Sequence, residues 1–226
     1  MQIFCDFDGT VTSHGTSDIL LAQFGDPKWE ALEAQWEAGL IGSAACMQQQ
    51  IAMINASQQD IDTALDEINI DPGFSEFVRF CSSRNFALTI ISDGVDYFIK
   101  RILARHKMAH LPIIANRLVA TGASSYKLEA PYAVNGCSSG VCKCQVVDSC
   151  ADVRIYIGDG HSDFCPVSKA DLIFAKHALA DYCDKQSLSY IPFQNFSDVQ
   201  NKLMLKPSGF TPLLPKHIHQ PLTARE

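Results

Sequence analysis

The sequence has little positive charge and no long apolar run, and these two shortages exclude several classes of protein. Its 18 lysines and arginines stand against 25 acidic residues, which gives a formal net charge of −7. Nucleic-acid-binding domains usually carry a basic patch or stripe, so we expect no nucleic-acid partner. No stretch reaches the roughly 18 uncharged apolar residues that a membrane-spanning helix needs, so we expect no membrane partner either.

The chain also lacks room for a leader before its first apolar run. That run, at 3–5, begins almost at the initiator methionine, whereas signal and transit peptides occupy about 15 to 30 residues. We therefore expect a cytoplasmic protein whose nine cysteines, an odd number, are reduced. Cys5, Cys46, Cys81 and Cys165 have apolar or core-like neighbours, and we expect all four in the core.

Short apolar runs alternate with helical patterns along most of the chain. Several runs are apolar throughout, as strands buried on both faces of a parallel sheet are. The alternation predicts a doubly wound α/β domain. The expected strands are Ile3–Phe7, Phe86–Ser92, Ile113–Val119, Val153–Gly158, Leu172–Ala175 and, more weakly, Ser189–Pro192. The expected helices are Gly73–Arg84, Val95–His106, Lys143–Cys150, His161–Ala170 and Leu179–Lys185.

The connection between the first two expected strands is far longer than the others. From about Thr16 to Glu67 its apolar residues recur at three- and four-residue spacing, which indicates helices. A plain loop of this length is uncommon, so we expect a helical cap inserted after the first strand. We expect Trp29 and Trp36 in the core of this cap, with a pocket wall as the alternative for one of them. The predicted boundaries are 1–14 and 72–205 for the α/β catalytic core, 15–71 for the cap, and 206–226 for an extended or disordered tail.

The strongest sign of chemistry is the pentapeptide Asp-Phe-Asp-Gly-Thr at 6–10, where the first expected strand ends. Ligands of open α/β sheets bind at the carboxyl ends of the strands, so Asp6 and Asp8 should both face that crevice. An ordinary turn is the alternative, since Asp and Gly are common turn formers. Four specified residue types in five positions arise by chance in on the order of one chain in a few hundred, which favours a functional role.

A second acidic stretch, Gly-Asp-Gly-His-Ser-Asp at 158–163, follows another apolar run. Mg²⁺ is usually held by one or two carboxylates together with water and phosphate, so Asp159 and Asp163 are candidate ligands. The alternative for Asp163 is a favourable acid at a helix N-terminus. Asp159, between two glycines, is harder to explain in that way.

Two weaker signals lie between these stretches. Ser92, Asp93 and Gly94 follow an apolar run and precede an expected helix, where a hydroxyl and backbone N–H groups can seat a phosphate. A simple helix cap is the alternative. Lys143 begins another expected helix and could neutralise a phosphate oxygen, although isolated surface lysines are far commoner. The order of the four motifs and their placement at strand ends favour a functional role for both.

These four motifs, in this order, resemble those of the haloacid dehalogenase superfamily of phosphatases. The resemblance spans most of the chain and implies a Rossmann-like core. The helical insert after the first motif is similar to the cap of the phosphoserine phosphatase-like subgroup. Within that subgroup the chain looks most like the bacterial phosphatases of methionine salvage, which act on 2-hydroxy-3-keto-5-methylthiopentenyl-1-phosphate. The residues that carry this closer likeness are Trp29, Leu32, Trp36, Gly42, Ser43, Cys46, Met47 and the pair Cys142 and Lys143.

The resemblance implies a Mg²⁺-dependent phosphoric monoester hydrolase with a covalent intermediate. Asp6 would attack phosphorus and form an aspartyl-phosphate. Asp8 would protonate the leaving alcohol and then activate water. The implied ligands of Mg²⁺ are Asp6, the backbone carbonyl of Asp8, Asp159 and Asp163, the last orienting either the metal shell or Lys143. The implied ligands of the substrate phosphate are Ser92, Asp93, Gly94, Lys143 and Thr10, of which Ser92 and Lys143 are also expected to be catalytic.

Two positions depart from the pattern of these relatives. Phosphoserine phosphatases carry an acid nine residues after the nucleophile, where it binds the substrate ammonium, and here that residue is Gly15. The stretch 42–46 also lacks the basic residue expected near the substrate in related caps. We therefore expect a cap that has lost an acid and a base together. This loss disfavours phosphoserine as the substrate and leaves open another small phosphorylated metabolite.

Three alternatives stay open at this point. A phospho-accepting regulatory domain uses similar residues, but Asp8 would shorten the life of its aspartyl-phosphate and a switch has no small substrate for a cap to enclose. A phosphotransferase or mutase on the same core would be separated by product analysis. The third alternative is a structural zinc site formed by Cys137, Cys142, Cys144 and Cys150. Zinc favours cysteine pairs two to four residues apart, whereas the intervening residues here number four, one and five.

Overall fold

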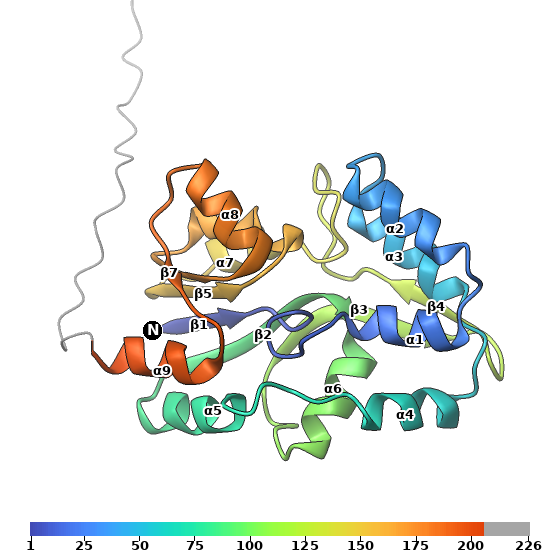
Figure 1. Cartoon of the computed structure of the whole chain (residues 1–226), viewed down its shortest axis with the longest axis horizontal. Coiled ribbons are helices and arrows are strands. Elements are labelled where there is room, and N and C mark those ends of the chain that lie inside the picture. Colours follow the sequence, from blue (N-terminus) through green and yellow to red (C-terminus); the bar gives the residue numbers. More distant parts are fainter. Residues whose placement is uncertain (206–226) are drawn as a thin grey trace, which may run out of the picture.

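The computed structural model describes residues 1–205, and it confirms the α/β fold with a mostly parallel sheet. The predicted tail at 206–226 lies outside the described residues. The strands are β1 (Gln2–Cys5), β2 (Ala87–Val95), β3 (Ile113–Ala120), β4 (Tyr126–Glu129), β5 (Arg154–Gly158), β6 (Leu172–Ala175) and β7 (Ile191–Pro192). They form one sheet in the order β4-β3-β2-β1-β5-β6-β7, in which β3 and β4 are antiparallel and the other neighbours are parallel (Figure 1).

The central strand β1 shows why the sheet is covered on both faces. Successive side chains of a strand point to opposite faces. Ile3 and Cys5 accordingly belong to one buried cluster, whereas Phe4 belongs to a second cluster on the other face. The neighbouring strand β5 divides in the same way, with Ile155 in the first cluster and Tyr156 in the second. Two separate cores of this kind explain the nearly continuous apolar runs in the sequence.

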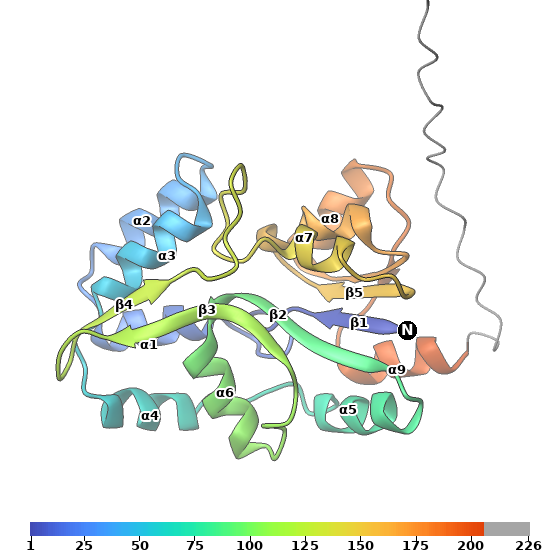
Figure 2. The same ribbon diagram turned by 180° about the vertical axis from the view of Figure 1, so that it is seen from behind.

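Helices cover each of these two cores. The α-helices are α1 (Thr16–Phe24), α2 (Trp29–Glu37), α3 (Ser43–Ala52), α4 (Gln58–Asp66), α5 (Phe74–Ser83), α6 (Asp96–Arg105), α7 (Lys143–Asp148), α8 (His177–Lys185) and α9 (Phe196–Met204). Helices α4, α5, α6 and α9 lie below the sheet in both Figure 1 and Figure 2, and α7 and α8 lie above it. None of the described helices combines the length and apolar composition that crossing a bilayer requires.

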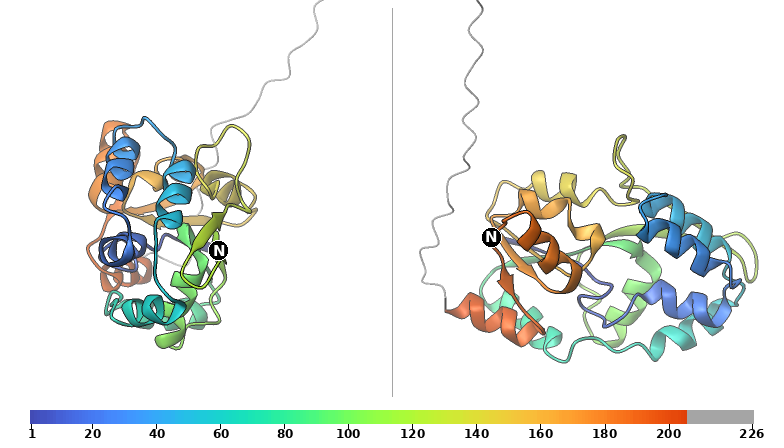
Figure 3. Two further views of the ribbon diagram at one scale, coloured as in Figure 1. Left: turned by 90° about the vertical axis from the view of Figure 1, so that its right-hand side faces the viewer. Right: turned by 45° about the horizontal axis from the view of Figure 1, so that its top comes forward.

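The long connection after β1 is helical, and its four helices take different positions. Helices α2 and α3 pack against each other, and α3 also packs against β4. The right-hand view of Figure 3 shows this pair at one end of the molecule and α9 at the other. Helix α4, by contrast, packs against α6 under the sheet. Helices α2 and α3 are therefore the part of the insert that lies near the carboxyl end of β1.

Four details differ from the sequence-based expectations. The sequence did not predict strand β4, because only two of its four residues, Tyr126 and Leu128, are buried apolar residues and so short a segment gives little apolar signal. Helix α9 was not expected either. The expected helix from His161 to Ala170 is instead two short 3₁₀ turns, η1 (His161–Asp163) and η2 (Pro166–Lys169), since a proline inside an α-helix removes a hydrogen bond and clashes with the preceding turn. Cys165 beside this proline is exposed, so its expected place in the core was wrong, whereas Cys5, Cys46 and Cys81 are buried.

Candidate active site

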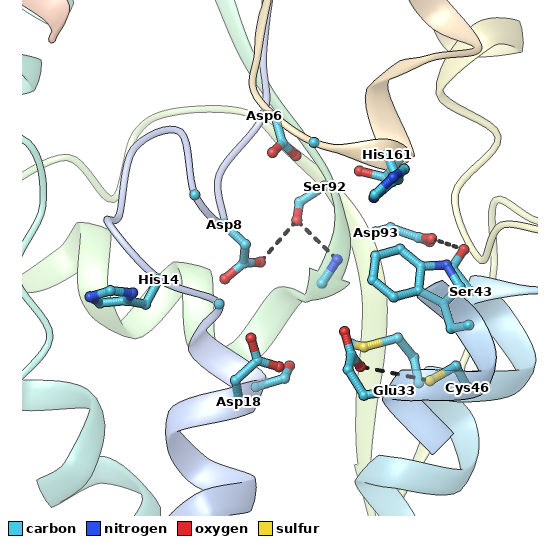
Figure 4. A pocket seen from close by; sticks show the side chains of 18 of the residues that line it. Asp6, Asp8, His14, Asp18, Glu33, Ser43, Cys46, Ser92, Asp93 and His161 are labelled. Atoms are coloured by element: carbon cyan, nitrogen blue, oxygen red, sulfur yellow. Dashed lines mark hydrogen bonds between the residues drawn. The ribbon is translucent and has the colours of Figure 1, made fainter. Parts of the chain in front are cut away.

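The four sequence motifs meet at the carboxyl edge of the sheet. The first motif follows β1, Ser92 to Gly94 lie near the end of β2, and Asp159 follows β5. Lys143 enters from the start of α7. Most of these residues line a pocket of about 310 Å³, which Figure 4 shows with Asp6 and Asp8 on one side and helices of the insert on the other.

A buried ion pair joins the first motif to Lys143. The Lys143 Nζ lies 2.6 Å from Asp6 Oδ1, 2.7 Å from Asp163 Oδ1 and 2.9 Å from Ser162 Oγ. These three bonds use all the donors of the ammonium group. Burial and the charge of Asp163 raise the pKa of Asp6, and Lys143 opposes them. Burial alone would lower the pKa of Lys143, but Asp163 and Asp6 raise it further, so the ammonium stays charged.

Three carboxylates form an oxygen cluster beside this pair. Asp6, Asp159 and Asp163 each offer one oxygen, and the three oxygens all lie within 4.8 Å of one another. Asp163 is held in place by the Tyr156 hydroxyl at 2.6 Å, and Asp159 accepts a bond of 2.6 Å from the Thr10 hydroxyl. Hard oxygen ligands in this number suit Mg²⁺. The residues present therefore fit a divalent cation.

Gly9 allows the first motif to approach this cluster closely. Its φ of +78° lies in the left-handed region that favours glycine. A Cβ on Gly9 would also collide with the carboxylate of Asp159. The left-handed turn of the backbone therefore favours glycine here, and its lack of a side chain lets the Asp159 carboxylate lie against the motif.

Asp8 turns away from the oxygen cluster and faces the pocket. Its Oδ1 accepts a 2.6 Å bond from the backbone N–H of Thr16, and its Oδ2 lies 3.4 Å from the Ser92 hydroxyl. Burial raises the pKa of Asp8, and the bond from Thr16 opposes the rise. The carboxylate of Asp8 does not belong to the group of three oxygens. A carboxyl group whose pKa is raised by burial, beside the Asp6 nucleophile candidate, has the chemistry of a general acid.

The motif on β2 places its three residues differently. Ser92 is buried, and its hydroxyl accepts a 2.9 Å bond from the backbone N–H of Gly94. The side chain of Asp93 accepts hydrogen bonds from Ser43 on α3 and from the backbone of Val141. The helix that follows, α6, has no side-chain cap, so Asp93 does not serve as the helix cap that the sequence also allowed.

The pocket contains acidic residues that the motif search did not identify. A Cβ on Gly15 would collide with the carboxylate of Asp18, which therefore occupies the space where a side chain at position 15 would begin. Asp18 thus supplies an acid in this space, and the expectation that the acid had been lost with Gly15 was wrong. Glu33 on α2 also lines the pocket, and Figure 4 shows both carboxylates at the end away from Asp6. Gly15 is the N-cap residue of α1 and Asp18 is the third residue of that helix, and this three-residue step from the cap into the first turn was the signal available in the sequence.

Negative charge gathers at the end of the pocket that holds Asp18 and Glu33. Partial burial of the carboxylate and the charges of Glu33, Asp8 and Glu37 raise the pKa of Asp18 to about 6, although the residue as a whole is exposed. Glu33 accepts a 2.8 Å bond from the Gln50 side chain, which holds it in place. Clustered carboxylates of this kind favour a positive charge between them.

An aromatic pair lines the same pocket. The rings of Trp36 on α2 and His161 on η1 meet edge to face, with centroids 5.9 Å apart. Trp36 lines the pocket, which is the alternative position that the sequence left open for one tryptophan, and Trp29 packs against the main core. The pair connects the insert to the loop that carries Asp159.

The cysteines near Lys143 do not form a metal site. Cys142 and Cys144 bring their sulfur atoms to 3.3 Å. Within residues 1–205, however, the ligand atoms of Cys137, Cys142, Cys144 and Cys150 make no group close enough to hold an ion. The described structure therefore does not support the zinc alternative.

Comparisons with known proteins agree with this site. Residues 1–187 match the sequence family described as Putative Phosphatase. A 2-hydroxy-3-keto-5-methylthiopentenyl-1-phosphate phosphatase of Brevibacillus brevis is 32% identical over 211 residues, which are 88% of this chain and 93% of the relative. A phosphatase of the same name from Geobacillus thermodenitrificans is 28% identical over 215 residues, 90% of this chain and 95% of the relative.

Solved structures show the same fold at low sequence identity. A phosphoserine phosphatase with a phospho-aspartyl intermediate analogue has a TM-score of 0.70 and 16% identity, covering 89% of this chain and 97% of that one. A phosphoserine phosphohydrolase-like protein from Francisella tularensis has a TM-score of 0.67 and 19% identity, covering 91% and 99%. The family match and the 32% identical relative together show that this chain belongs to the Putative Phosphatase family, a group of phosphoric monoester hydrolases with the haloacid dehalogenase fold.

Proposed function

We propose that this protein is a Mg²⁺-dependent phosphatase that hydrolyses a small phosphate monoester through an aspartyl-phosphate on Asp6. The observation that carries the proposal is the buried pair of Asp6 and Lys143, at 2.6 Å, beside Asp159 and Asp163 at the strand ends. A nucleophile, a fixed positive charge and a cluster of oxygen ligands within one pocket are the parts that phosphoryl transfer requires. The membership of the chain in a phosphatase family supports the same reaction.

The first chemical step is attack on phosphorus by a carboxylate oxygen of Asp6. A P–O bond forms to Asp6, the P–O bond to the alcohol breaks, and Asp8 gives its proton to the departing oxygen. The raised pKa of Asp8 supports this role, because the carboxyl group must hold a proton when the alcohol leaves. Asp8 then takes a proton from water, which attacks the aspartyl-phosphate and releases phosphate and free Asp6.

We place the transferred phosphoryl group between four sets of donors. Lys143 provides a positive charge that is buried and already held in place, and the Ser92 hydroxyl lies at the Asp8 side of the pocket. The backbone N–H groups of Asp93 and Gly94 and the Thr10 hydroxyl complete the predicted seat. Gly94 would exchange its bond to Ser92, and Thr10 its bond to Asp159, for phosphoryl oxygens. Mg²⁺, held by Asp6, the Asp8 carbonyl and Asp159, with Asp163 orienting the shell, would supply charge that neutralises the phosphoryl oxygens.

We further propose that the insert acts as a cap on this site. The predicted cap spans 15–71, and α2 and α3 within it supply pocket-lining residues. Enclosure by these helices would exclude water during attack on phosphorus and require opening for release of the products. We also propose that the protein works in the cytoplasm, where the nine thiols, all free in the described structure, would stay reduced.

The first candidate substrate is 2-hydroxy-3-keto-5-methylthiopentenyl-1-phosphate. This compound appears in the names of the Brevibacillus brevis and Geobacillus thermodenitrificans relatives. Three side chains of the pocket suit a methylthio group, because thioethers pack well against aromatic rings and sulfur. They are Trp36, Cys46 and Met47, all from α2 and α3.

The second candidate is a phosphate monoester with a positively charged amine. Asp18 and Glu33 lie at the end of the pocket away from Asp6, and the charge of Glu33 helps to raise the pKa of Asp18. No lysine or arginine lines this pocket in the described structure to neutralise them. A protonated amine between the two carboxylates would do so, with Trp36 available for a cation–π contact.

A panel of phosphate esters tests both the reaction and the substrate. Phosphate release would be measured for wild type and Asp6→Asn, with Mg²⁺ and with chelator, on the methylthiopentenyl compound, aminoalkyl phosphates, phosphoserine and sugar phosphates. Mg²⁺-dependent turnover that is lost in Asp6→Asn is expected. Asp18→Asn separates the candidates, because it should impair turnover of aminoalkyl phosphates and leave the methylthio compound nearly unchanged. Stable phosphorylation of Asp6 without turnover of any ester would point instead to the regulatory domain.

A further inference from the structure

The carboxylate of Asp93 is shared by three separate parts of the chain. It lies on β2 and is only 8% exposed. One oxygen, Oδ2, accepts the hydroxyl hydrogen of Ser43 on α3, a bond drawn in Figure 4. The other, Oδ1, accepts a 2.9 Å bond from the backbone N–H of Val141 and a 3.3 Å bond from the Asn116 amide on β3. Asp93 thus connects the cap, the sheet and the loop that leads to Lys143.

The bond to Val141 lies two residues before the start of α7. Val141 is fully buried, and its carbonyl accepts a 2.8 Å bond from the backbone N–H of Lys143. The backbone N–H of Cys142 between them bonds to Tyr132 at 3.1 Å. Holding Val141 in place therefore holds the backbone of Lys143, whose ammonium must reach Asp6.

The start of α3 touches the same loop at a second point. The backbone N–H of Ala44 donates a 3.0 Å bond to the carbonyl of Ser138. A Cβ on Gly42 would collide with the backbone of Ser138, so the close approach requires glycine there. On the opposite side, Asn116 is fully buried and leaves no room for a Cβ on Gly140. The loop before Lys143 is therefore held between α3 and β3, and Asp93 bonds to both sides.

We propose that Asp93 is a positioning residue through which the seating of α3 controls the placement of Lys143. The bond from Ser43 fixes the orientation of the Asp93 carboxylate, and that orientation presents Oδ1 to Val141. When α3 moves away, Asp93 loses the Ser43 bond, its carboxylate turns more freely, and the loop to Lys143 loosens. The lysine is then firmly aligned with Asp6 only while the cap is seated. This inference rests on the proposed role of Lys143 in binding the phosphoryl group.

Ser43→Ala tests the link by removing one hydroxyl from the cap. Hydrogen exchange of the Val141 and Lys143 amides should become about tenfold faster, since a bond to a charged acceptor is lost. The kcat for the best ester should fall about tenfold, with KM changed less than about twofold, because alignment of Lys143 matters most in the transition state. Ser43→Thr keeps the hydroxyl and should restore both values. Ser138→Ala, which removes an exposed hydroxyl from the other side of the same contact, should change neither.

Asp93→Ala gives a second, independent test. Alanine offers no side-chain acceptor to Ser43 or to Val141, so the link breaks at both contacts. Combining it with Ser43→Ala should therefore add little further loss of kcat. Unchanged exchange at Val141 in Ser43→Ala, or fully additive losses in the double variant, would overturn the inference. Exchange is measured without turnover, so a wild type that hydrolyses no ester would refute the proposed function and leave this test intact.

Discussion

The ammonium of Lys143 lies between two buried carboxylates, 2.6 Å from Asp6 and 2.7 Å from Asp163. The exposed fractions of the three side chains are 2%, 5% and 0%. Two carboxylates at such short range repel each other strongly away from water, so the lysine has a structural task besides any contact with substrate. Loss of this one cation should therefore affect folding and activity together.

Lys143→Met should cost about 3–5 kcal/mol of unfolding free energy, because it leaves buried charges without their partner. It should also reduce phosphate release by at least about 100-fold, through loss of the charge beside the transferred phosphoryl group. Urea denaturation and the release assay measure the two effects. The matched control is Lys100→Met, whose ion pair with Asp96 lies at the surface and should contribute less than about 1 kcal/mol. Equal stability of the Lys143 variant and wild type would contradict the prediction.

Asp8→Asn should lower kcat by about 100- to 10,000-fold, because asparagine can neither give a proton to the leaving alcohol nor take one from water. With an aryl phosphate, whose leaving group needs little protonation, attack by Asp6 should still proceed. The aspartyl-phosphate should then accumulate, since the second step still lacks its base. Rapid quenching and hydroxylamine trapping would detect it. A variant that turns over alkyl and aryl phosphates at wild-type rates would exclude Asp8 as the acid and base.

The pKa of Asp18, raised to about 6, predicts a pH dependence of stability. Between about pH 4 and 6 the folded protein holds a proton on Asp18 that the unfolded chain has released, so the unfolding free energy falls as pH rises through this window. Asp18→Asn removes that fall. The difference between the variant and wild type should grow from pH 4 to 6 and then level off, at about 1 kcal/mol or less because the side chain reaches water. A difference that does not change with pH would contradict the prediction.

The same titration predicts a functional signature for an amine-bearing substrate. Ionised Asp18 attracts the ammonium group, so kcat/KM for an aminoalkyl phosphate should rise as pH rises through about 6. Asp18→Asn should flatten this rise and increase KM. The methylthiopentenyl compound, which carries no ammonium, serves as the control substrate. An identical pH profile for both substrates in wild type would show that Asp18 does not bind the substrate cation.

The sequence predicted the parts of this site that depend on local chain geometry. Asp6 and Asp159 each follow an apolar strand, Ser92 lies toward the end of another, and parallel strands bring their carboxyl ends to one edge. The predicted order of motifs was sufficient to place these side chains near one another. It could not show that Lys143 would be enclosed by two carboxylates, since that depends on how α7 packs against the sheet.

The far end of the pocket could not be predicted for a related reason. Asp18 and Glu33 lie on different helices of the insert, and only tertiary packing brings them to the same space. Gly15 suggested the loss of an acid because a comparison of sequences matches residues position by position. In the folded chain, the space beside Gly15 is occupied by the carboxylate of Asp18, three residues further on. The 3₁₀ turns around Pro166 were missed because apolar spacing alone does not reveal where a helix is interrupted.

Removal of Mg²⁺ gives the most direct test of the oxygen cluster. Without a cation, Asp6, Asp159 and Asp163 hold three oxygens within 4.8 Å of one another, and their repulsion should make this edge less stable. Added Mg²⁺ should raise Tm, by about 2–4 °C for each kcal/mol of binding free energy in a chain of this size.

Asp159→Asn should have a higher Tm than wild type in chelator and a much smaller rise with Mg²⁺. Asp152→Asn, at an acid with 75% exposure, is the control and should respond as wild type does. An undiminished Mg²⁺ response in Asp159→Asn would mean that the ion binds elsewhere, because this substitution removes one of the cluster's three ligands.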